Sequence, residues 1–386
     1  MENMAHTREE LAYLQSMSLD SKIEFTKRRI RGWWESWLKY EIYNTNTGEY
    51  RYVTGREGEL PKLRKGETCD PFDAERGQVY VSFSGGKDST VLLHIARQLY
   101  SDIEAVFVNT GLEYPEIQQF VKTFDNVTIL RPKMRLDEVL KTYGYPIISK
   151  EVSEKVWNSR KGGYCRDDFI TNTPRERRNN HRYSMVKWHS LLNVDFEISN
   201  LCCHTMKKQP CKQYEKETGK YPIIATMASE SRNRMQSWLK SGCNAFDNSR
   251  PTSQPMSFWT EQDVLQYIKR HNISICSVYG DVVYENDSEQ LRLGDLGVDG
   301  LGNERLTTTG CDRTGCVFCG FGCHLEKEPS RFQRLKVTHP KQYEYCIGGG
   351  EYDENGIWKP NKQGLGMGHV FDELNKIYGD GFIKYH

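Results

Sequence analysis

Residues 84–90 of this chain read Ser-Gly-Gly-Lys-Asp-Ser-Thr, and this stretch decides the fold. An apolar run over 79–83 precedes it and a helical pattern over 91–95 follows it, which predicts a strand, a tight turn and a helix. The two glycines let the backbone approach an anion closely, and the helix start offers free N–H groups and the positive end of its dipole. Lys87 adds a positive charge. We therefore predict that residues 84–89, the phosphate loop, bind phosphate groups.

This loop differs from the Walker A loop of many nucleotide-hydrolysing enzymes. A Walker A match would need Gly at position 81 and Ser or Thr at position 88. The chain has Val81 and Asp88 at these positions. A different phosphate chemistry is indicated. The plain structural alternative is a glycine-rich turn that only opens a helix.

Composition sets the outer bounds. The chain has 386 residues, 37% of them hydrophobic, and a formal net charge of +1, which suits an enzyme with a sizeable core and no general affinity for polyanions. We find no apolar run of signal-peptide or membrane-span length, so we expect a cytoplasmic protein without a membrane partner. In that compartment its 12 cysteines are better interpreted as reduced thiols or metal ligands than as disulfides.

Three regions are expected along the chain. They are a helical N-terminal segment with a hairpin over 1–70, a nucleotide-binding α/β domain over 71–300, and a Cys-rich segment with a tail over 301–386. In the first, 11–43 is predicted to be helical and 44–70 to form the hairpin. Buried strands are predicted at 79–83, 105–109, 127–130, 196–199 and 223–227. Their continuous apolarity is typical of a parallel sheet with helices on both faces.

A basic segment over 160–187 has two interpretations. It carries eight Lys or Arg residues, among them Arg160 and Lys187, with few aliphatic side chains. It is either a solvated arm or an electropositive surface that guides a nucleic acid or another phosphate-bearing substrate. Interleaved aromatic residues such as Tyr183 and Trp188 would suit nucleotide stacking.

Three further motifs follow the phosphate loop in order. Residues 106–116 read Val-Phe-Val-Asn-Thr-Gly-Leu-Glu-Tyr-Pro-Glu, and residues 228–234 read Ala-Ser-Glu-Ser-Arg-Asn-Arg. Residues 255–268 read Pro-Met-Ser-Phe-Trp-Thr-Glu-Gln-Asp-Val-Leu-Gln-Tyr-Ile, with Thr260 as an expected helix cap. Together with the loop, these motifs resemble the PP-loop ATP pyrophosphatase superfamily. Within it they are similar to the phosphoadenylyl-sulfate (PAPS) reductase family, close to its iron–sulfur and DNA-phosphorothioation members.

The resemblance implies a Rossmann-like fold of the adenine-nucleotide alpha-hydrolase type. It also implies that ATP, with Mg²⁺, is cleaved between its α and β phosphates. Lys87, Asp88 and Arg234 would then be catalytic, although Asn109 replaces the family's usual Asp at the end of the second strand. The implied nucleotide-binding residues are Ser82, Ser84, Gly85, Gly86, Lys87, Asp88, Ser89, Asn109, Thr110, Gly111, Glu230 and Ser231.

The cysteines cluster in two places. Cys316 and Cys319 form a Cys-x-x-Cys pair, which can hold one metal ion or two corners of an iron–sulfur cube. The resemblance implies that this pair joins the adjacent Cys202 and Cys203 to bind a [4Fe–4S] cluster. Three alternatives stay open, namely a compact set that takes in Cys311 and Cys323, a structural Zn²⁺ site, and bare thiols.

The leading hypothesis is an ATP-cleaving, adenylyl-transferring enzyme in sulfur insertion into a nucleic acid or nucleotide. A sulfur donor protein such as a cysteine desulfurase would be its partner. The first alternative is an assimilatory sulfonucleotide reductase, but the chain has no cysteine near its end. Its last one, Cys346, is either a substitute nucleophile or a core residue. The second alternative is an ATP-regulated nucleic-acid-binding subunit.

Overall fold

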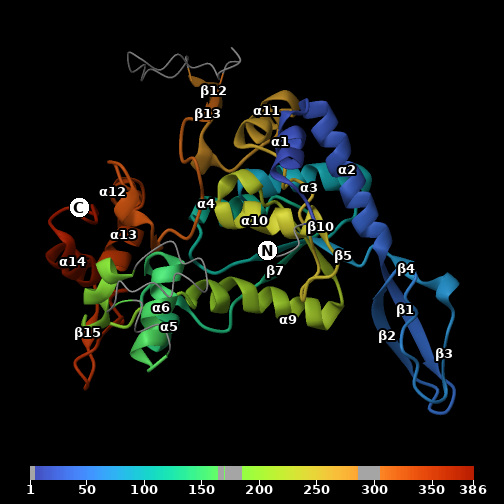
Figure 1. Cartoon of the computed structure of the whole chain (residues 1–386), viewed down its shortest axis with the longest axis horizontal. Coiled ribbons are helices and arrows are strands. Elements are labelled where there is room, and N and C mark those ends of the chain that lie inside the picture. The colour runs from blue at the N-terminus through green and yellow to red at the C-terminus, as the bar shows by residue number, and fades with distance from the viewer. Residues whose placement is uncertain (1–4, 164–168, 170–184, 286–304) are drawn as a thin grey trace. The chain divides into compact units, whose positions relative to one another are not determined.

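The computed structural model describes residues 5–163, 169, 185–285 and 305–386 (Figure 1). The chain packs into two compact units. Unit 1 comprises Met1–Asn109, Tyr114–Leu130 and Cys211–Thr314, and unit 2 comprises Thr110–Glu113, Arg131–Pro210 and Gly315–His386. Segments distant in sequence share a unit, so these units cut across the three ranges expected along the chain.

A six-stranded sheet forms the centre of unit 1. Its strand order is β10-β11-β9-β5-β6-β7, and every pairing is parallel except that of β10 with β11. The strands are β5 (Val79–Ser82), β6 (Ala105–Val108), β7 (Val127–Leu130), β9 (Tyr221–Ile224), β10 (Asn244–Ala245) and β11 (Thr252–Ser253). Because β5 lies between β6 and β9, the phosphate loop follows the strand where the order reverses. Open α/β sheets bind ligands at that point.

Helices cover both faces of this sheet, as the sequence predicts. Val79 and Val81 of β5 belong to the main core, which also contains residues of α2 (Leu19–Ser36), α3 (Lys87–Leu99) and α11 (Glu261–His271). Tyr80 faces the other way and packs with Val106 and with Tyr214 of α9 (Gln209–Thr218). Figure 1 shows α9 on one side of the sheet and α3 on the other.

The N-terminal helix is shorter than predicted. After α1 (Arg8–Ser16) and α2, a strand, β1 (Trp37–Asn44), begins where the sequence predicts helix to continue to residue 43. The prediction is wrong there because the buried Leu38, Tyr40 and Ile42 follow a two-residue period. The hairpin predicted over 44–70 is only partly correct, because its strands β2 (Tyr50–Arg56) and β3 (Glu67–Cys69) do not pair with each other. Both pair with β1, as does β4 (Glu75–Arg76).

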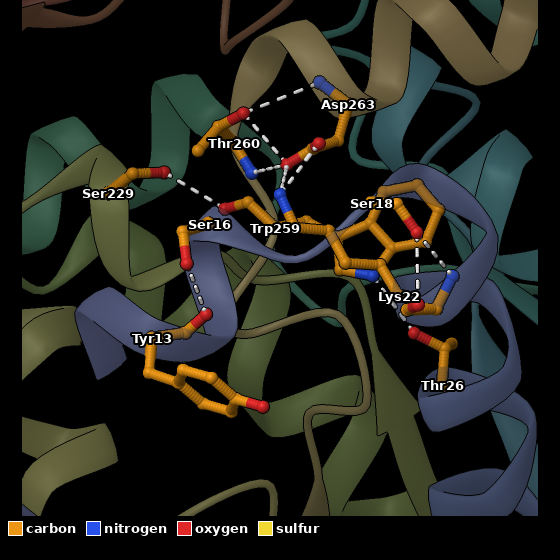
Figure 2. A network of polar contacts seen from close by, with 10 residues as sticks. Tyr13, Ser16, Ser18, Lys22, Thr26, Ser229, Trp259, Thr260 and Asp263 are labelled. Atoms are coloured by element: carbon orange, nitrogen blue, oxygen red, sulfur yellow. Dashed lines mark hydrogen bonds and ion pairs between the residues drawn. The ribbon is translucent and has the colours of Figure 1, made fainter. Parts of the chain in front are cut away.

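A buried ion pair fastens α2 to α11. The Lys22 ammonium donates to both carboxylate oxygens of Asp263 at 2.7 Å (Figure 2). Asp263 also accepts the backbone N–H of Thr260 at 2.7 Å, which completes the capping box predicted from the sequence. Beside it, the Trp259 indole donates to the Thr26 hydroxyl at 2.9 Å. The N-terminal helix is therefore an integral part of unit 1.

We expect Lys22→Met to lower the free energy of unfolding of unit 1 by about 3–5 kcal/mol, because it leaves the Asp263 carboxylate buried without its counter-charge. Denaturant unfolding followed by circular dichroism measures this change. Lys27→Met is the matched control, since Lys27 lies on the same helix and its ion pair within the described residues is with Glu24, whose side chain is 63% exposed. Equal losses in both variants would contradict the assignment.

The remaining elements of unit 1 are short. They are α4 (Pro115–Val121), α10 (Arg232–Ser241), β12 (Val282–Tyr284), β13 (Leu306–Thr308) and the 3-10 turns η1 (Pro71–Asp73), η4 (Ala228–Glu230) and η5 (Ser277–Tyr279).

Unit 2 is mainly helical. Its helices are α5 (Leu136–Tyr143), α6 (Lys150–Arg160), α12 (Arg331–Thr338), α13 (Pro340–Ile347) and α14 (Met367–Tyr378), with the 3-10 turns η2 (Val186–Leu192) and η7 (Cys323–Leu325) and the π-helical turn η3 (His204–Lys208). Its short strands are β8 (Ile147–Ile148), β14 (Gly320–Phe321), β15 (Glu351–Tyr352) and β16 (Trp358–Lys359).

The strand predicted at 196–199 does not form. Phe196 and Ile198 make only isolated bridges, to Trp358 and Tyr145, and their side chains are buried in unit 2. The prediction is wrong because this apolar stretch is buried in unit 2 and does not join the central sheet. Among the described residues, no helix has the length and apolar character that a membrane crossing needs.

Candidate functional site

The phosphate loop is a tight turn that depends on glycine. Gly85 has φ of 71°, and a Cβ there would meet Ile117 and Val121 at 2.9 Å. The Ser89 hydroxyl donates to the Gly86 carbonyl at 2.9 Å and accepts the backbone N–H of Ser84 at 3.2 Å. These bonds close the turn directly before the N-terminus of α3, where backbone donors favour an anion.

The Lys87 side chain is buried, with 4% of its surface exposed. Its ammonium donates to the Asp312 carbonyl at 2.7 Å and lies 3.0 Å from a carboxylate oxygen of Glu261. Its backbone N–H donates to the Tyr279 hydroxyl at 3.2 Å. The sequence motifs did not indicate these three partners.

Asp88 contributes a buried carboxylate oxygen to this region. Its Oδ1 atom is buried and has no hydrogen-bond partner among the described residues. Burial raises the pKa of Asp88, and the nearby Lys87 ammonium opposes that rise. A buried carboxylate oxygen without a donor suits a hard cation, so the residues present fit the predicted Mg²⁺.

A second charged group follows β9 at the same edge of the sheet. Glu230 pairs with Arg234 and lies 3.5 Å from a guanidinium nitrogen of Arg313. Burial, and then the neighbouring Arg313, lower the pKa of Arg234. Both arginines act electrostatically on Asp88. The structure thus brings Lys87, Asp88 and Arg234, the three predicted catalytic residues, to one edge of the unit 1 sheet.

The other predicted nucleotide contacts have less direct geometry. Ser231 caps α10 by accepting the Arg234 backbone N–H at 3.3 Å, and Ser82 ends β5. Asn109 follows β6, and its amide donates to Gln118 at 3.5 Å. Thr110 and Gly111 belong to unit 2. A nucleotide-binding role for these five residues stays a prediction.

Four thiols line one pocket of unit 2. Cys202, Cys203, Cys316 and Cys319 surround it together with Leu112, Leu136, Pro146, Met206, Lys207 and Phe318. The pocket has about 350 Å³ of space, part of it open to solvent. Sequence positions more than a hundred residues apart therefore meet as the resemblance implies.

Two backbone segments carry these thiols. Cys202 and Cys203 directly precede the π-helical turn η3, a local widening that is frequent at functional sites. The Cys-x-x-Cys segment turns back on itself, because the Cys319 N–H donates to the Cys316 carbonyl at 3.1 Å. The Arg331 guanidinium stabilises the same turn by donating a hydrogen bond to the Cys319 carbonyl at 2.9 Å.

One of the four pocket thiols, Cys203, has a lowered pKa. The hydrogen bond with Cys203 raises the pKa of Cys202, and burial raises the pKa of Cys319. A hydrogen bond from Cys202 lowers the pKa of Cys203 to about 6, and three lysines reinforce this against the effect of burial. Burial raises the pKa of Cys316 to about 11, while Lys207 opposes the rise. Lys207 hydrogen-bonds this thiol and lies 3.5 Å from Glu113. Four thiols that line one pocket, with Lys207 beside them to balance negative charge, are a donor set that fits an iron–sulfur cluster.

The alternative cysteines lie elsewhere. Cys311 belongs to unit 1, where its N–H donates to the Val278 carbonyl at 2.8 Å. Cys323 is buried, does not line the pocket, and donates its thiol hydrogen to the Gly320 carbonyl at 3.0 Å. Across the described part of the chain, no three His, Cys, Asp or Glu side chains are arranged to hold a single metal ion. A cluster of several atoms needs a wider ring of ligands.

The predicted basic arm falls largely outside the described residues. Of its flanks, Arg160 donates to the carbonyls of Leu191, Val194 and Phe196 at 2.6–3.0 Å. This arginine therefore fastens unit 2 internally. Lys187 lies over the Trp188 ring at 4.7 Å.

Several known proteins are similar to parts of this chain. A curated but uncharacterized protein of Methanocaldococcus jannaschii is 38% identical over 73 residues, 18% of each chain. An adenosine 5'-phosphosulfate reductase of Bacillus cereus is 26% identical over 135 residues, 33% of this chain. The match spans only about half, 52%, of that reductase. A crystal structure of a PAPS reductase from Candida auris in a phosphate complex is similar at a TM-score of 0.31 with 12% identity, covering 71% of this chain and 92% of that one.

The family model for the phosphoadenosine phosphosulfate reductase domain matches residues 78–167 and 168–320. This range holds the phosphate loop, the Glu230 group and all four pocket thiols. It covers more than half of the 386 residues. The chain therefore belongs to the phosphoadenosine phosphosulfate reductase domain family.

Proposed function

We propose that this chain is a cytoplasmic enzyme that binds ATP at the phosphate loop, splits it into AMP and pyrophosphate, and adenylylates an acceptor in sulfur transfer to a nucleic acid or nucleotide. The observation that carries this proposal is the complete phosphate loop at the carboxyl end of β5, with Lys87 buried behind it. Sulfonucleotide substrates have no pyrophosphate to release, so a reductase would not need all of these groups.

The reaction can be assigned to residues of unit 1. An acceptor oxygen attacks the α-phosphorus, the bond to the α–β bridging oxygen breaks, and pyrophosphate leaves with its negative charge. A sulfur nucleophile from the donor protein then attacks the adenylylated acceptor, and the bond to the adenylyl oxygen breaks to release AMP. Lys87 and the loop amides stabilise the charge of the leaving pyrophosphate. Asp88 would hold Mg²⁺, which would supply positive charge for the phosphate groups. Arg234 neutralises charge at the acceptor side.

The pocket of unit 2 suits a [4Fe–4S] cluster on Cys202, Cys203, Cys316 and Cys319. Such a cluster, when bound, supplies electron transfer or an iron site for sulfur. Lys207 compensates the negative charge of the thiolates. A sulfur donor protein and the basic segment 160–187, as a surface for the acceptor, complete the proposal.

A sulfonucleotide reductase is the second candidate, favoured by the curated relatives named adenosine 5'-phosphosulfate reductase. Cys346 is 0% exposed and burial raises its pKa. An internal nucleophile there would be both inaccessible and protonated. Cys346 therefore does not suit the role of a reductase nucleophile.

The deciding experiment incubates the anaerobically purified chain with ATP, Mg²⁺ and nucleic acid. AMP and pyrophosphate support the proposal, whereas ADP and orthophosphate contradict it. In a parallel reaction, sulfite formed from adenylyl sulfate with thioredoxin would establish the reductase. Salt-sensitive nucleic-acid binding without any turnover would indicate the binding subunit instead.

A further inference from the structure

The segment directly before the Cys-x-x-Cys pair lies on the phosphate loop. This segment, Thr309 to Thr314, is called the strap here. The N–H groups of Gly310 and Cys311 donate to the carbonyls of Tyr279 and Val278 at 2.8 Å. A Cβ on Gly310 would meet the Val278 carbonyl at 2.4 Å, so the close approach depends on this glycine.

The strap and its neighbours engage the groups that a phosphate would use. The Asp312 carbonyl accepts from the Lys87 ammonium at 2.7 Å. The Tyr279 hydroxyl accepts the Lys87 N–H at 3.2 Å, and it lies 2.6 Å from the Thr314 hydroxyl. Glu261 supplies a carboxylate to the same ammonium at 3.0 Å. A carbonyl, a carboxylate and a hydroxyl thus stand where anionic oxygens would bind.

We propose that the strap is an autoinhibitory contact, which a polyphosphate must displace to reach Lys87. This regulation rests on the proposed function, since it concerns the same loop. The Lys87 ammonium and N–H already have hydrogen-bond partners in the closed arrangement. Breaking these bonds costs free energy, which lowers the apparent affinity for phosphate by the same amount.

Displacement also has a consequence for the thiol pocket. Only Gly315 separates Thr314 from Cys316, which is a predicted cluster ligand. A shift of the strap must therefore change the backbone conformation next to Cys316. Coupling between binding sites is reciprocal. Polyphosphate binding is therefore expected to change the alkylation rate of Cys316 in chain from which metal has been removed, and metal loading is expected to change polyphosphate affinity.

The test measures binding of inorganic pyrophosphate and of ATP by calorimetry. Thr314→Val removes one hydrogen bond that holds the closed arrangement, and Tyr279→Phe removes two, the bond to Thr314 and the bond from the Lys87 N–H. Each variant should therefore tighten pyrophosphate binding, by about fivefold for Thr314→Val and by at least as much for Tyr279→Phe. Thr307→Val in β13 is the matched control and should leave the affinity unchanged. Weaker or unchanged binding in both strap variants would overturn the proposal, because these hydroxyls would then serve the ligand or be irrelevant to it.

Hydrogen exchange of the wild-type chain gives an independent readout that needs no variant. A peptide covering 309–315 should exchange faster when pyrophosphate is bound. Slower or equal exchange would contradict the strap. Tighter pyrophosphate binding in the variants without AMP formation from ATP would retain the strap and reject only the proposed function.

Discussion

Lys87→Ala is expected to lower AMP and pyrophosphate formation by about 100- to 1000-fold, the range found when one preorganised donor to a developing charge is removed. The ammonium is buried at the phosphate loop and would compensate the charge of the leaving pyrophosphate. Quantifying both products by chromatography at saturating ATP separates this effect from weaker binding. Asp88→Asn should cause a similar loss, because an amide oxygen holds Mg²⁺ less strongly than a carboxylate.

The matched control for Lys87 is Lys27→Ala, which removes a lysine of the same unit whose carboxylate partner is exposed. It should retain the wild-type rate. If Lys87→Ala also retained it, the triphosphate would have to react elsewhere. Folding is verified by the thermal transition of each variant, since loss of Lys87 also leaves Glu261 without this partner.

Cys316→Ser and Cys203→Ser are expected to reduce bound iron from about four atoms per chain to near zero, because a cubane cluster requires a full set of thiolates. Iron and sulfide analysis of anaerobically purified chain measures the loss, and the broad visible absorption of the cluster disappears with it. Cys311→Ser should retain its iron, since Cys311 is not among the residues that line the thiol pocket. Cys69→Ser, in β3, is a second control.

Two outcomes would contradict this assignment. If Cys311→Ser and Cys323→Ser lose the metal while Cys203→Ser keeps it, the compact ligand set is correct. If the purified chain holds one zinc ion and no sulfide, the site is a structural zinc site.

Four of the six strands of the central sheet could be predicted because their sequences are largely apolar, whereas β10 and β11 are two residues long, mostly polar, and were not predicted. The runs at β5, β6, β7 and β9 therefore stand out from the surrounding sequence. The segment 37–43 could not be assigned in this way, because Trp33, Trp34 and Trp37 fit a helical period while Leu38, Tyr40 and Ile42 fit a strand. Strand pairing with β2, which no local pattern reports, decides the outcome.

The candidate site was predictable where it consists of short motifs. The phosphate loop, Glu230 with Arg234, and the two cysteine pairs each have a local signature. Lys207 lies within such a motif, but its contact with Cys316 depends on the fold. No sequence motif indicates the partners of Lys87. One partner is a backbone carbonyl, which any residue could supply. Glu261 lies in a segment whose sequence is already accounted for by its role as a helix start.

The Lys22–Asp263 pair has a practical consequence for anyone who isolates the catalytic region. A fragment that starts at residue 78, the beginning of the family match, discards the lysine and retains the aspartate. Its newly uncovered hydrophobic face and uncompensated anion would favour aggregation, and an inactive fragment would then reveal nothing about the chemistry. Any shortened version of this chain should therefore begin upstream of α2.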